Sequence, residues 1–302
     1  MYDIIVVGGG PAGLTAALYA LRANKKVLVT EKATFGGQIT YSPKVENIPG
    51  FLSVTGNEYA EKLVEQVIAQ GAEVEFCEVT EVKNGEIKTV VTDSGEFEAK
   101  AVIIATGAKH RLLGLEKEEQ FIGEGISFCA VCDGAFYRDK TVAVIGGGNS
   151  ALQEALLLAE LAKKVYIIQN LDFLTGEEML QKQIENKNNI EVILGATVDS
   201  LFGDTEFKGI VIANQSDGSK SEITLDGMFV AIGLIPQNDI FSDLITLDER
   251  GYADSNEACL TATEGVFVAG DCRKKEVRQL TTAMADGATA ALAACKFIDS
   301  KK

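Results

Sequence analysis

The chain has 302 residues and is 46% apolar, which is enough for two domains of ordinary size. Its formal net charge of −16 excludes the broad basic surface that nucleic acid requires, so we expect no nucleic-acid partner. The six cysteines are too few and too irregularly spaced for a secreted disulfide scaffold. We therefore expect a reducing, cytoplasmic setting.

The first long apolar stretch, residues 4–21, carries no charged side chain and is as long as a membrane span. Gly8, Gly9, Gly10 and Pro11 interrupt it, and no basic segment precedes it. The stretch therefore predicts a buried strand, a tight turn and a helix, and we expect no membrane partner.

One pattern occurs twice in the chain. Residues 2–31 align with residues 140–169 at a constant offset of 138 and without a gap. Each copy has an apolar strand, a Gly-x-Gly-x-x-Gly or Ala turn, an amphipathic helix and a second apolar strand, which together form a dinucleotide-binding βαβ unit. The repeat predicts an α/β fold with two Rossmann-like, three-layer dinucleotide-binding domains.

The first copy has the residues that an adenine dinucleotide needs. Gly8 allows the tight bend, and Gly10 lets the backbone approach a pyrophosphate at the start of the helix. Gly13 lets the helix pack close to the strand. The second strand ends in Glu31, whose carboxylate can accept hydrogen bonds from ribose hydroxyls.

The second copy ends differently. Gln169 stands where the first copy has Glu31, and no lysine or arginine occurs from Val165 to Gln181. The missing carboxylate counts against NAD, and the missing cations count against the 2′-phosphate of NADP. Arginines from elsewhere in the chain are the alternative that would restore a nucleotide site.

A Cys-x-x-Cys pair, Cys129 and Cys132, is followed directly by Asp133. A zinc site would need two more ligands, but His110 is the only histidine and the other cysteines are isolated, so we expect no metal. Buried structural thiols are a second alternative. A redox pair is favoured, because a Cys-x-x-Cys closes a small disulfide ring and lowers a thiol pKa. Asp133 is the expected acid/base, a role that is compatible with capping a turn or helix.

After the second copy, the chain returns to the first domain. Residues 265–272 predict a buried strand ending in Gly270 and Asp271, an acid that can hold sugar hydroxyls, and a long helix follows to about Ile298. The second domain is therefore inserted into the first. The predicted bounds are 1–114 and 245–302 for the split domain and 115–244 for the inserted domain.

This order of motifs resembles the low-molecular-weight thioredoxin reductases over nearly the whole chain. The motifs that carry the resemblance are GGGPAG at 8–13, GGQ at 36–38, VENIPG at 45–50, ATGA at 105–108, CAVCD at 129–133, GD at 270–271 and RQ at 278–279. The resemblance implies FAD bound in the split domain, a redox dithiol in the inserted domain, thioredoxin as partner, and a homodimer. The FAD contacts that it implies are Gly8, Gly10, Pro11, Ala12, Gly13, Glu31, Gly37, Gln38, Asn47, Thr106, Gly107, Gly270, Asp271, Arg278 and Gln279.

The resemblance also implies that Cys132 faces the flavin and that Cys129 attacks the partner disulfide. Ordinary members read the NADP 2′-phosphate with a His-Arg-Arg segment and a further arginine, whereas this chain has Gln169, Asn170 and Leu171 at those positions. The chain therefore looks closest to the ferredoxin-dependent flavin thioredoxin reductases.

The predicted function is that of an FAD-dependent thioredoxin-disulfide reductase. Electrons would pass from reduced ferredoxin through FAD to the Cys129–Cys132 disulfide and then to thioredoxin. The alternatives are the same reductase using NADPH or NADH, a flavin-dependent dithiol oxidase using oxygen, and a flavin-bearing redox sensor. The basic segment 273–275 is either a solvated loop or a docking patch for an acidic electron carrier.

Overall fold

The two copies of the sequence repeat fold in the same way. A computed structural model describes residues 1–42 and 44–301. The first copy forms β1 (Tyr2–Val7), α1 (Pro11–Arg22) and β2 (Val27–Glu31), and the second forms β9 (Thr141–Ile145), α5 (Asn149–Ala159) and β10 (Lys164–Ile168).

The repeat extends to strand register. In the first copy Ile4 pairs with Val27 in parallel strands, and in the second Val142 pairs with Val165, which are the equivalent positions 138 residues later. The predicted α/β fold with two Rossmann-like units is confirmed.

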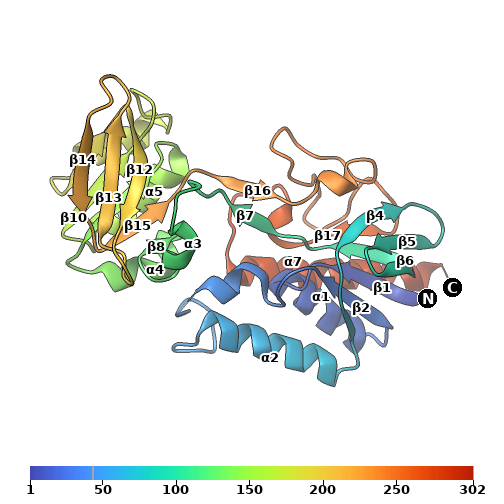
Figure 1. Ribbon diagram of the computed structural model, residues 1–302. Helices are drawn as coiled ribbons and strands as arrows, with labels where there is room; N and C mark the ends of the chain where they lie inside the picture. The colour runs from blue at the N-terminus through green and yellow to red at the C-terminus, as the bar shows by residue number, and fades with distance from the viewer. Residues whose placement is uncertain (43, 302) are drawn as a thin grey trace. The chain divides into compact units, whose positions relative to one another are not determined.

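The chain divides into two units (Figure 1). The first comprises Met1–Lys109 and Ile235–Lys302, and the second, inserted unit comprises His110–Leu234. The connecting segments are β7 (Ala108–His110) and β16 (Leu234–Pro236), which pair with each other in a two-stranded sheet.

The predicted domain boundaries lie in polar segments near residues 114 and 244. Both connecting strands lie a few residues earlier in the chain than these segments. At the first one, the backbone N–H groups of Leu113, Gly114 and Leu115 donate to the buried Glu118 carboxylate inside the inserted unit. At the second, Phe241 is fully buried in a core of the first unit. Polar or turn-prone sequence here reflects local hydrogen bonding rather than a linker.

The first unit is built on a seven-stranded sheet in the order β3-β2-β1-β6-β5-β4, with β17 also paired to β6. Strands β1, β2, β3 and β17 run parallel to their neighbours, whereas β4 and β5 are antiparallel. The remaining strands are β3 (Glu73–Phe76), β4 (Val79–Lys83), β5 (Lys88–Thr92), β6 (Gly95–Ile104) and β17 (Val266–Val268).

Helices cover one face of this sheet. They are α1, α2 (Gly56–Ala69) and α7 (Leu280–Ser300), and short 3-10 turns lie at η1 (Gly37–Tyr41), η3 (Asp239–Phe241) and η4 (Gly270–Cys272). Gly287 of α7 packs against α1 so closely that a Cβ there would lie 2.1 Å from the Ala12 carbonyl oxygen. On the other face, β4, β5 and Phe241 close a second core.

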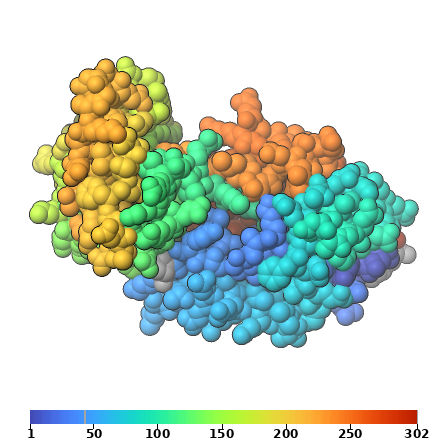
Figure 2. Space-filling view, in the orientation of Figure 1, coloured from blue at the N-terminus to red at the C-terminus, as the bar shows by residue number. Residues whose placement is uncertain are grey.

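The inserted unit has a parallel sheet in the order β11-β10-β9-β15-β8 and a separate antiparallel sheet, β12-β13-β14. Its strands are β8 (Ile126–Ser127), β11 (Ile190–Ile193), β12 (Ala196–Phe202), β13 (Gly209–Asn214), β14 (Lys220–Thr224) and β15 (Gly227–Val230). Its shorter helices are α3 (Glu118–Phe121), α4 (Ala130–Asp133), η2 (Gly134–Tyr137) and α6 (Glu178–Glu185). The yellow and gold atoms of β12–β14 lie on the visible surface of this unit in Figure 2.

Among the residues that the structure describes, no helix combines the length and the apolar character that a membrane crossing needs.

Candidate functional site

The first glycine turn forms the start of a cradle for an anion. Gly8 has φ +109°, and a Cβ there would lie 2.4 Å from the Ala105 carbonyl oxygen, so only glycine fits. Helix α1 then begins at Pro11 with no side chain capping it. The backbone N–H groups of Ala12 and Gly13 have no intrahelical acceptor, and the helix dipole makes this end a site for a pyrophosphate.

Glu31 is fixed at the end of β2 beside this turn. One carboxylate oxygen accepts the Gly9 N–H at 2.8 Å, and the other accepts the Ala33 N–H at 2.9 Å. Each oxygen keeps a further lone pair for a hydroxyl donor. The carboxylate is therefore positioned for a ribose next to the pyrophosphate position.

Asp271 lies at the same end of the sheet, in η4 after β17. Gly270 before it has φ +81°, and a Cβ there would lie 2.8 Å from the Ala12 Cβ, so this turn packs directly against the start of α1. The Oδ1 atom of Asp271 is buried and has no hydrogen-bond partner among the described residues. Burial raises the pKa of this carboxyl group. A buried acceptor of this kind fits a sugar or ribityl hydroxyl of a bound dinucleotide.

Two further predicted contacts lie close together. The Asn47 side chain donates to the Gln279 side chain at 3.4 Å, and Gln279 is the N-cap residue of α7. Gly37, with φ +59°, starts η1, and a Cβ there would lie 3.4 Å from the Gly10 Cα. Gln38 follows Gly37 in η1. The loop after β2 therefore meets the first glycine turn.

Arg278 organises the loop before α7. Its guanidinium donates to the carbonyl oxygens of Asp271, Arg273 and Lys275 and lies 4.1 Å from the centroid of the Tyr252 ring. Through these contacts Arg278 fixes the backbone of the segment that follows Asp271.

Sequence reasoning missed Asn238, which is fully buried beside this site. Its side-chain oxygen accepts from the Thr106 hydroxyl at 3.1 Å, and its amide donates to the carbonyl oxygens of Gly251 and Cys272. It therefore joins the Thr106–Gly107 turn, where Gly107 has φ +68°, to the end of η4. A lone asparagine after a short strand carries no sequence signal for this role.

The basic segment 273–275 is neither a solvated loop nor a docking patch. Arg273 is buried and pairs with Asp286 at 2.7 Å, and Lys275 pairs with the same carboxylate at 2.8 Å. Only Lys274 of the three is exposed. The acidic partner lies eleven residues or more further along the chain, so the local sequence did not reveal that these cations are internal.

The cysteine pair forms a disulfide in the inserted unit. Cys129 is the N-cap residue of α4, and its sulfur accepts the Cys132 backbone N–H at 3.2 Å. Both cysteines are half-buried, whereas Val131 between them is 61% exposed. The disulfide therefore lies at the surface of its unit, which suits exchange with another protein.

Asp133 is tied to this disulfide through Ser127. The Ser127 hydroxyl donates to Asp133 Oδ2 at 2.6 Å and accepts the Cys129 N–H at 3.1 Å. Burial raises the pKa of Asp133, and the Ser127 hydrogen bond opposes this rise. A carboxyl group whose pKa is raised keeps its proton more readily than an ordinary aspartic acid, which suits an acid/base next to a dithiol. The ring of His110, by contrast, stacks on Phe128 at 4.4 Å, and burial lowers its pKa to about 4.

The second glycine turn has the same backbone conformation as the first, but a different residue stands at the end of the strand that follows its helix. Gly146 has φ +129°, as the turn requires. Gln169 is buried, and its amide donates to the Phe173 carbonyl oxygen at 3.3 Å. A Cβ at Gly147 would lie 2.6 Å from the Gln169 amide carbon. A neutral, internally bonded amide thus fills the place that a ribose-binding carboxylate has in the first copy.

A carboxylate also lies at the start of α5. The Asn149 side chain accepts the Glu177 N–H at 2.7 Å and donates to the Glu177 carboxylate at 2.9 Å. The N–H groups of Thr175 and Gly176 both donate to the Gly147 carbonyl oxygen at 2.9 Å. The loop after β10 therefore folds against the turn and holds a negative charge next to Asn149, the first residue of α5.

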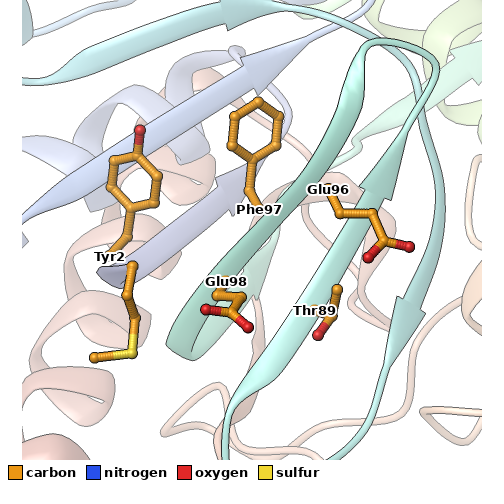
Figure 3. Close-up of a pocket in the computed structure, with 6 residues that line it drawn as sticks. Tyr2, Thr89, Glu96, Phe97 and Glu98 are labelled. Carbon is orange, nitrogen blue, oxygen red and sulfur yellow. The ribbon is translucent and has the colours of Figure 1, made fainter.

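One surface pocket lies away from these features. It has a volume of about 480 Å³ and is lined by Tyr2, Thr89 and the segment 96–98, with Met1 (Figure 3). It lies at the amino-terminal end of β1, whereas the first glycine turn follows the carboxyl end. In parallel sheets, ligands bind at the carboxyl ends of the strands, so this pocket is not the dinucleotide site.

Comparison with known proteins agrees with this geometry. The sequence profile described as Pyridine nucleotide-disulphide oxidoreductase matches residues 2–287. A thioredoxin reductase from Listeria monocytogenes is 40% identical over 100% of this chain and 95% of its own length. A protein from Clostridium pasteurianum, described as a 34.2 kDa protein in rubredoxin operon, is 39% identical over 99% of this chain and 98% of its own.

Solved structures agree as well. The crystal structure of thioredoxin reductase from Streptococcus pyogenes is 37% identical, covers 99% of both chains and has a TM-score of 0.95. The Lactococcus lactis thioredoxin reductase in its FR conformation is 38% identical, covers 99% of this chain and 100% of its own, and has a TM-score of 0.70.

A dinucleotide cradle in one unit and a redox disulfide in the other define a flavoprotein disulfide oxidoreductase. The chain belongs to the pyridine nucleotide-disulphide oxidoreductase family, within the low-molecular-weight thioredoxin reductases. Thioredoxin reductases of this family bind FAD, which confirms the predicted cofactor.

Proposed function

We propose that this chain reduces the disulfide of thioredoxin with electrons that come from a reduced ferredoxin rather than from a pyridine nucleotide. The observation that carries the choice of donor is the second glycine turn. There the neutral Gln169 side chain lies at the ribose end, and the Glu177 carboxylate is held next to the helix start by the Asn149 side chain.

The lack of a carboxylate at the ribose end weakens the expected binding of a pyridine nucleotide considerably. A hydrogen bond to a charged group contributes about 1.5–3 kcal/mol. Losing the two that a carboxylate would make to ribose hydroxyls weakens binding by about 100-fold or more, at about 1.4 kcal/mol per factor of ten. The neutral Gln169 side chain could accept only uncharged hydrogen bonds from these hydroxyls, which contribute about 0.5–1.5 kcal/mol each, and one of its N–H groups already donates to the Phe173 carbonyl oxygen.

The helix start argues in the same direction. An anion at a helix N-terminus is stabilised by about 0.3–1 kcal/mol at an exposed site. The Glu177 carboxylate accepts from the side chain of Asn149, the first residue of α5, and a negative charge there repels a second anion at this helix start. No lysine or arginine between Val165 and Gln181 offsets that repulsion.

Ferredoxin is energetically suited to the reaction. A plant-type ferredoxin lies near about −400 mV and thioredoxin near about −270 mV. The gap corresponds to roughly 6 kcal/mol for two electrons, at about 1.4 kcal/mol per 30 mV. Reduction of thioredoxin by this donor is therefore strongly downhill.

A reductase using NADPH or NADH is the second candidate, because the second copy keeps its strand register and its Gly146 conformation. Such a turn retains the backbone of a nucleotide site even where the side chains are unsuited. Residues outside segment 165–181 would then have to supply the missing cations.

FAD would be held in the first unit. Its pyrophosphate would lie against the Gly8–Gly13 turn at the start of α1, an adenosine ribose against Glu31, and the ribityl hydroxyls against the unpartnered Asp271 oxygen. Asn47 and Gln279 would complete the site near the start of α7. When bound, FAD supplies the two-electron chemistry that connects the donor to the disulfide.

The dithiol residues perform the exchange. We assign Cys129 as the thiol that attacks the partner disulfide and Cys132 as the thiol that faces the flavin, as the family resemblance implies. Ser127 fixes Asp133 beside the pair through its 2.6 Å hydrogen bond. Asp133 then gives a proton to the leaving thiolate of the partner.

We further propose a homodimer that works in the cytoplasm, as the resemblance and the cysteine content imply. Sedimentation velocity of the FAD-loaded protein tests the assembly, and a single species at the monomer mass would contradict it.

The test of the proposed function is a thioredoxin-reduction assay under anaerobic conditions with different donors. Reduced ferredoxin should support continuous formation of thioredoxin thiols, whereas NADPH and NADH should give little. Turnover with NADPH at a rate equal to that with ferredoxin would contradict the donor assignment while leaving the reductase activity intact.

A further inference from the structure

Two carboxyl groups lie on packed helices in the unit that carries the redox disulfide. Asp133 ends α4, Glu154 lies in α5, and these two helices pack against each other within the inserted unit. Glu154 lies three residues after the buried Ala151 and four before the buried Leu158, so it shares a helical face with them. An acidic side chain on this apolar face requires a physical explanation.

One oxygen of each carboxyl group is buried without a partner. These atoms are Asp133 Oδ1 and Glu154 Oε2, and neither has a hydrogen-bond partner among the described residues. Two ionised carboxylates in this position would leave two buried charges uncompensated, which is costly. A single proton shared between them removes one charge and turns one acceptor into a donor.

We propose that Asp133 and Glu154 hold one proton between them at neutral pH, and that Glu154 is a positioning residue that keeps Asp133 supplied with a proton for dithiol exchange. The exchange role rests on the proposed function, whereas the shared proton is a property of the folded chain.

The surrounding groups are consistent with a retained proton. Burial and the Asp133 charge together raise the pKa of Glu154 to about 8. Burial, with the charges of Asp133 and Asp226, raises the pKa of Tyr137 to about 12. The Ser127 hydroxyl favours the ionised form of Asp133, and it donates to the other oxygen, Oδ2. The charge of the pair is therefore concentrated on the Ser127 side.

The exchange reaction balances with this pair. Each thiol passes its proton to the pair as its sulfur attacks, first Cys129 on the partner disulfide and then Cys132 on the Cys129 sulfur of the mixed disulfide. Each departing partner thiolate takes one proton back. The partner gains two electrons and two protons, this chain loses the same, and the pair begins and ends with one proton.

Infrared spectroscopy of the FAD-loaded protein tests the shared proton directly. At pH 7 we expect a carbonyl stretch from a protonated carboxyl group that moves when glutamate is labelled with ¹³C. The band should vanish in Glu154→Gln and change frequency in Asp133→Asn, because that substitution removes the carboxyl group with which Glu154 shares the proton. A band whose frequency does not shift with ¹³C-glutamate, or that persists in Glu154→Gln, overturns the proposal. A band that is unchanged in Asp133→Asn shows that the proton is not shared with Asp133.

The rate of dithiol exchange tests the positioning role. Because a positioned acid contributes about 10²–10⁴-fold, loss of its proton supply in Glu154→Gln should slow thioredoxin reduction at pH 7 by about tenfold. We expect the wild-type rate to fall as the pH passes about 8, where the pair loses its proton, and this fall should be absent in Glu154→Gln. Glu160→Gln, an exposed carboxylate next to the end of the same helix, is the control and should change neither.

A pH profile that is identical in Glu154→Gln and the wild type overturns the role of Glu154. If the infrared band behaves as expected but no donor supports thioredoxin reduction, the proposed function fails while the shared proton stands.

Discussion

Replacing Glu154 with glutamine should make the inserted unit more stable than in the wild type, by a margin that grows as the pH rises. Burial and the charge of Asp133 raise the pKa of this carboxyl group from 4.5 to about 8. Between these two values the folded chain keeps a proton that the unfolded chain releases. Stability that is fully present below pH 4.5 is therefore lost as the pH rises to about 8. Glutamine is neutral throughout and does not lose it.

The size of this effect follows from the pKa window. It spans 3.5 pH units, from 4.5 to 8. At about 1.4 kcal/mol per unit, the wild type loses roughly 5 kcal/mol relative to the variant across the window. The Glu154 residue as a whole is only partly buried, so solvent screening reduces the expected difference to roughly 2–4 kcal/mol.

Hydrogen exchange at pH 5 and pH 8 is the appropriate assay, because the slowest amides of β9 and β10 report the opening of the inserted unit separately from the FAD unit. The stability difference between Glu154→Gln and the wild type should grow from near zero to roughly 2–4 kcal/mol. Glu160→Gln should show no such growth. A difference that is the same at both pH values would refute the reasoning.

Three other substitutions test the remaining parts of the account. Asp271→Ala removes the buried acceptor and should weaken FAD binding by about 10- to 100-fold, measured by flavin retained on ultrafiltration. Gly8→Ala places a Cβ 2.4 Å from a carbonyl oxygen at φ +109° and should cost about 1–3 kcal/mol of stability in thermal unfolding, with loss of FAD. Cys129→Ser should abolish thioredoxin reduction in the thiol assay while donor-dependent bleaching of the flavin continues; retained thioredoxin reduction would contradict the role of this cysteine.

The features that sequence predicts well here are those set by local spacing. The glycine turns require positive φ and close approach at fixed positions, so Gly8 and Gly146 identify both βαβ units from the sequence alone. Glu31 followed from its place at the end of the second strand. The Cys-x-x-Cys spacing likewise identified the disulfide.

The features that sequence could not give depend on residues far apart in the chain. Arg273 looked like a surface cation because its partner, Asp286, lies on α7. Asn238 is fixed by a hydroxyl 132 residues earlier. In the sequence, Glu154 looks like an ordinary exposed helix residue, and only the packing of α4 against α5 buries its carboxyl group and exposes it to the charge of Asp133. Tertiary burial, rather than local pattern, decides the chemistry of these groups.

The same reasoning applies to the electron donor. The glycine turn of the second copy predicts a nucleotide site by its backbone, while its side chains argue against one. The absence of lysine and arginine from segment 165–181 can be read from the sequence. The hydrogen bonds that the Gln169 and Glu177 side chains make within the chain can be seen only in the folded structure.

Anaerobic rapid mixing of the FAD-loaded protein with each donor, followed at the flavin absorbance band, tests the central claim most directly. The account predicts fast bleaching by reduced ferredoxin and no bleaching on that timescale by NADPH or NADH, because the second glycine turn lacks the carboxylate and the cations that bind them. Fast and complete bleaching by NADPH would contradict it.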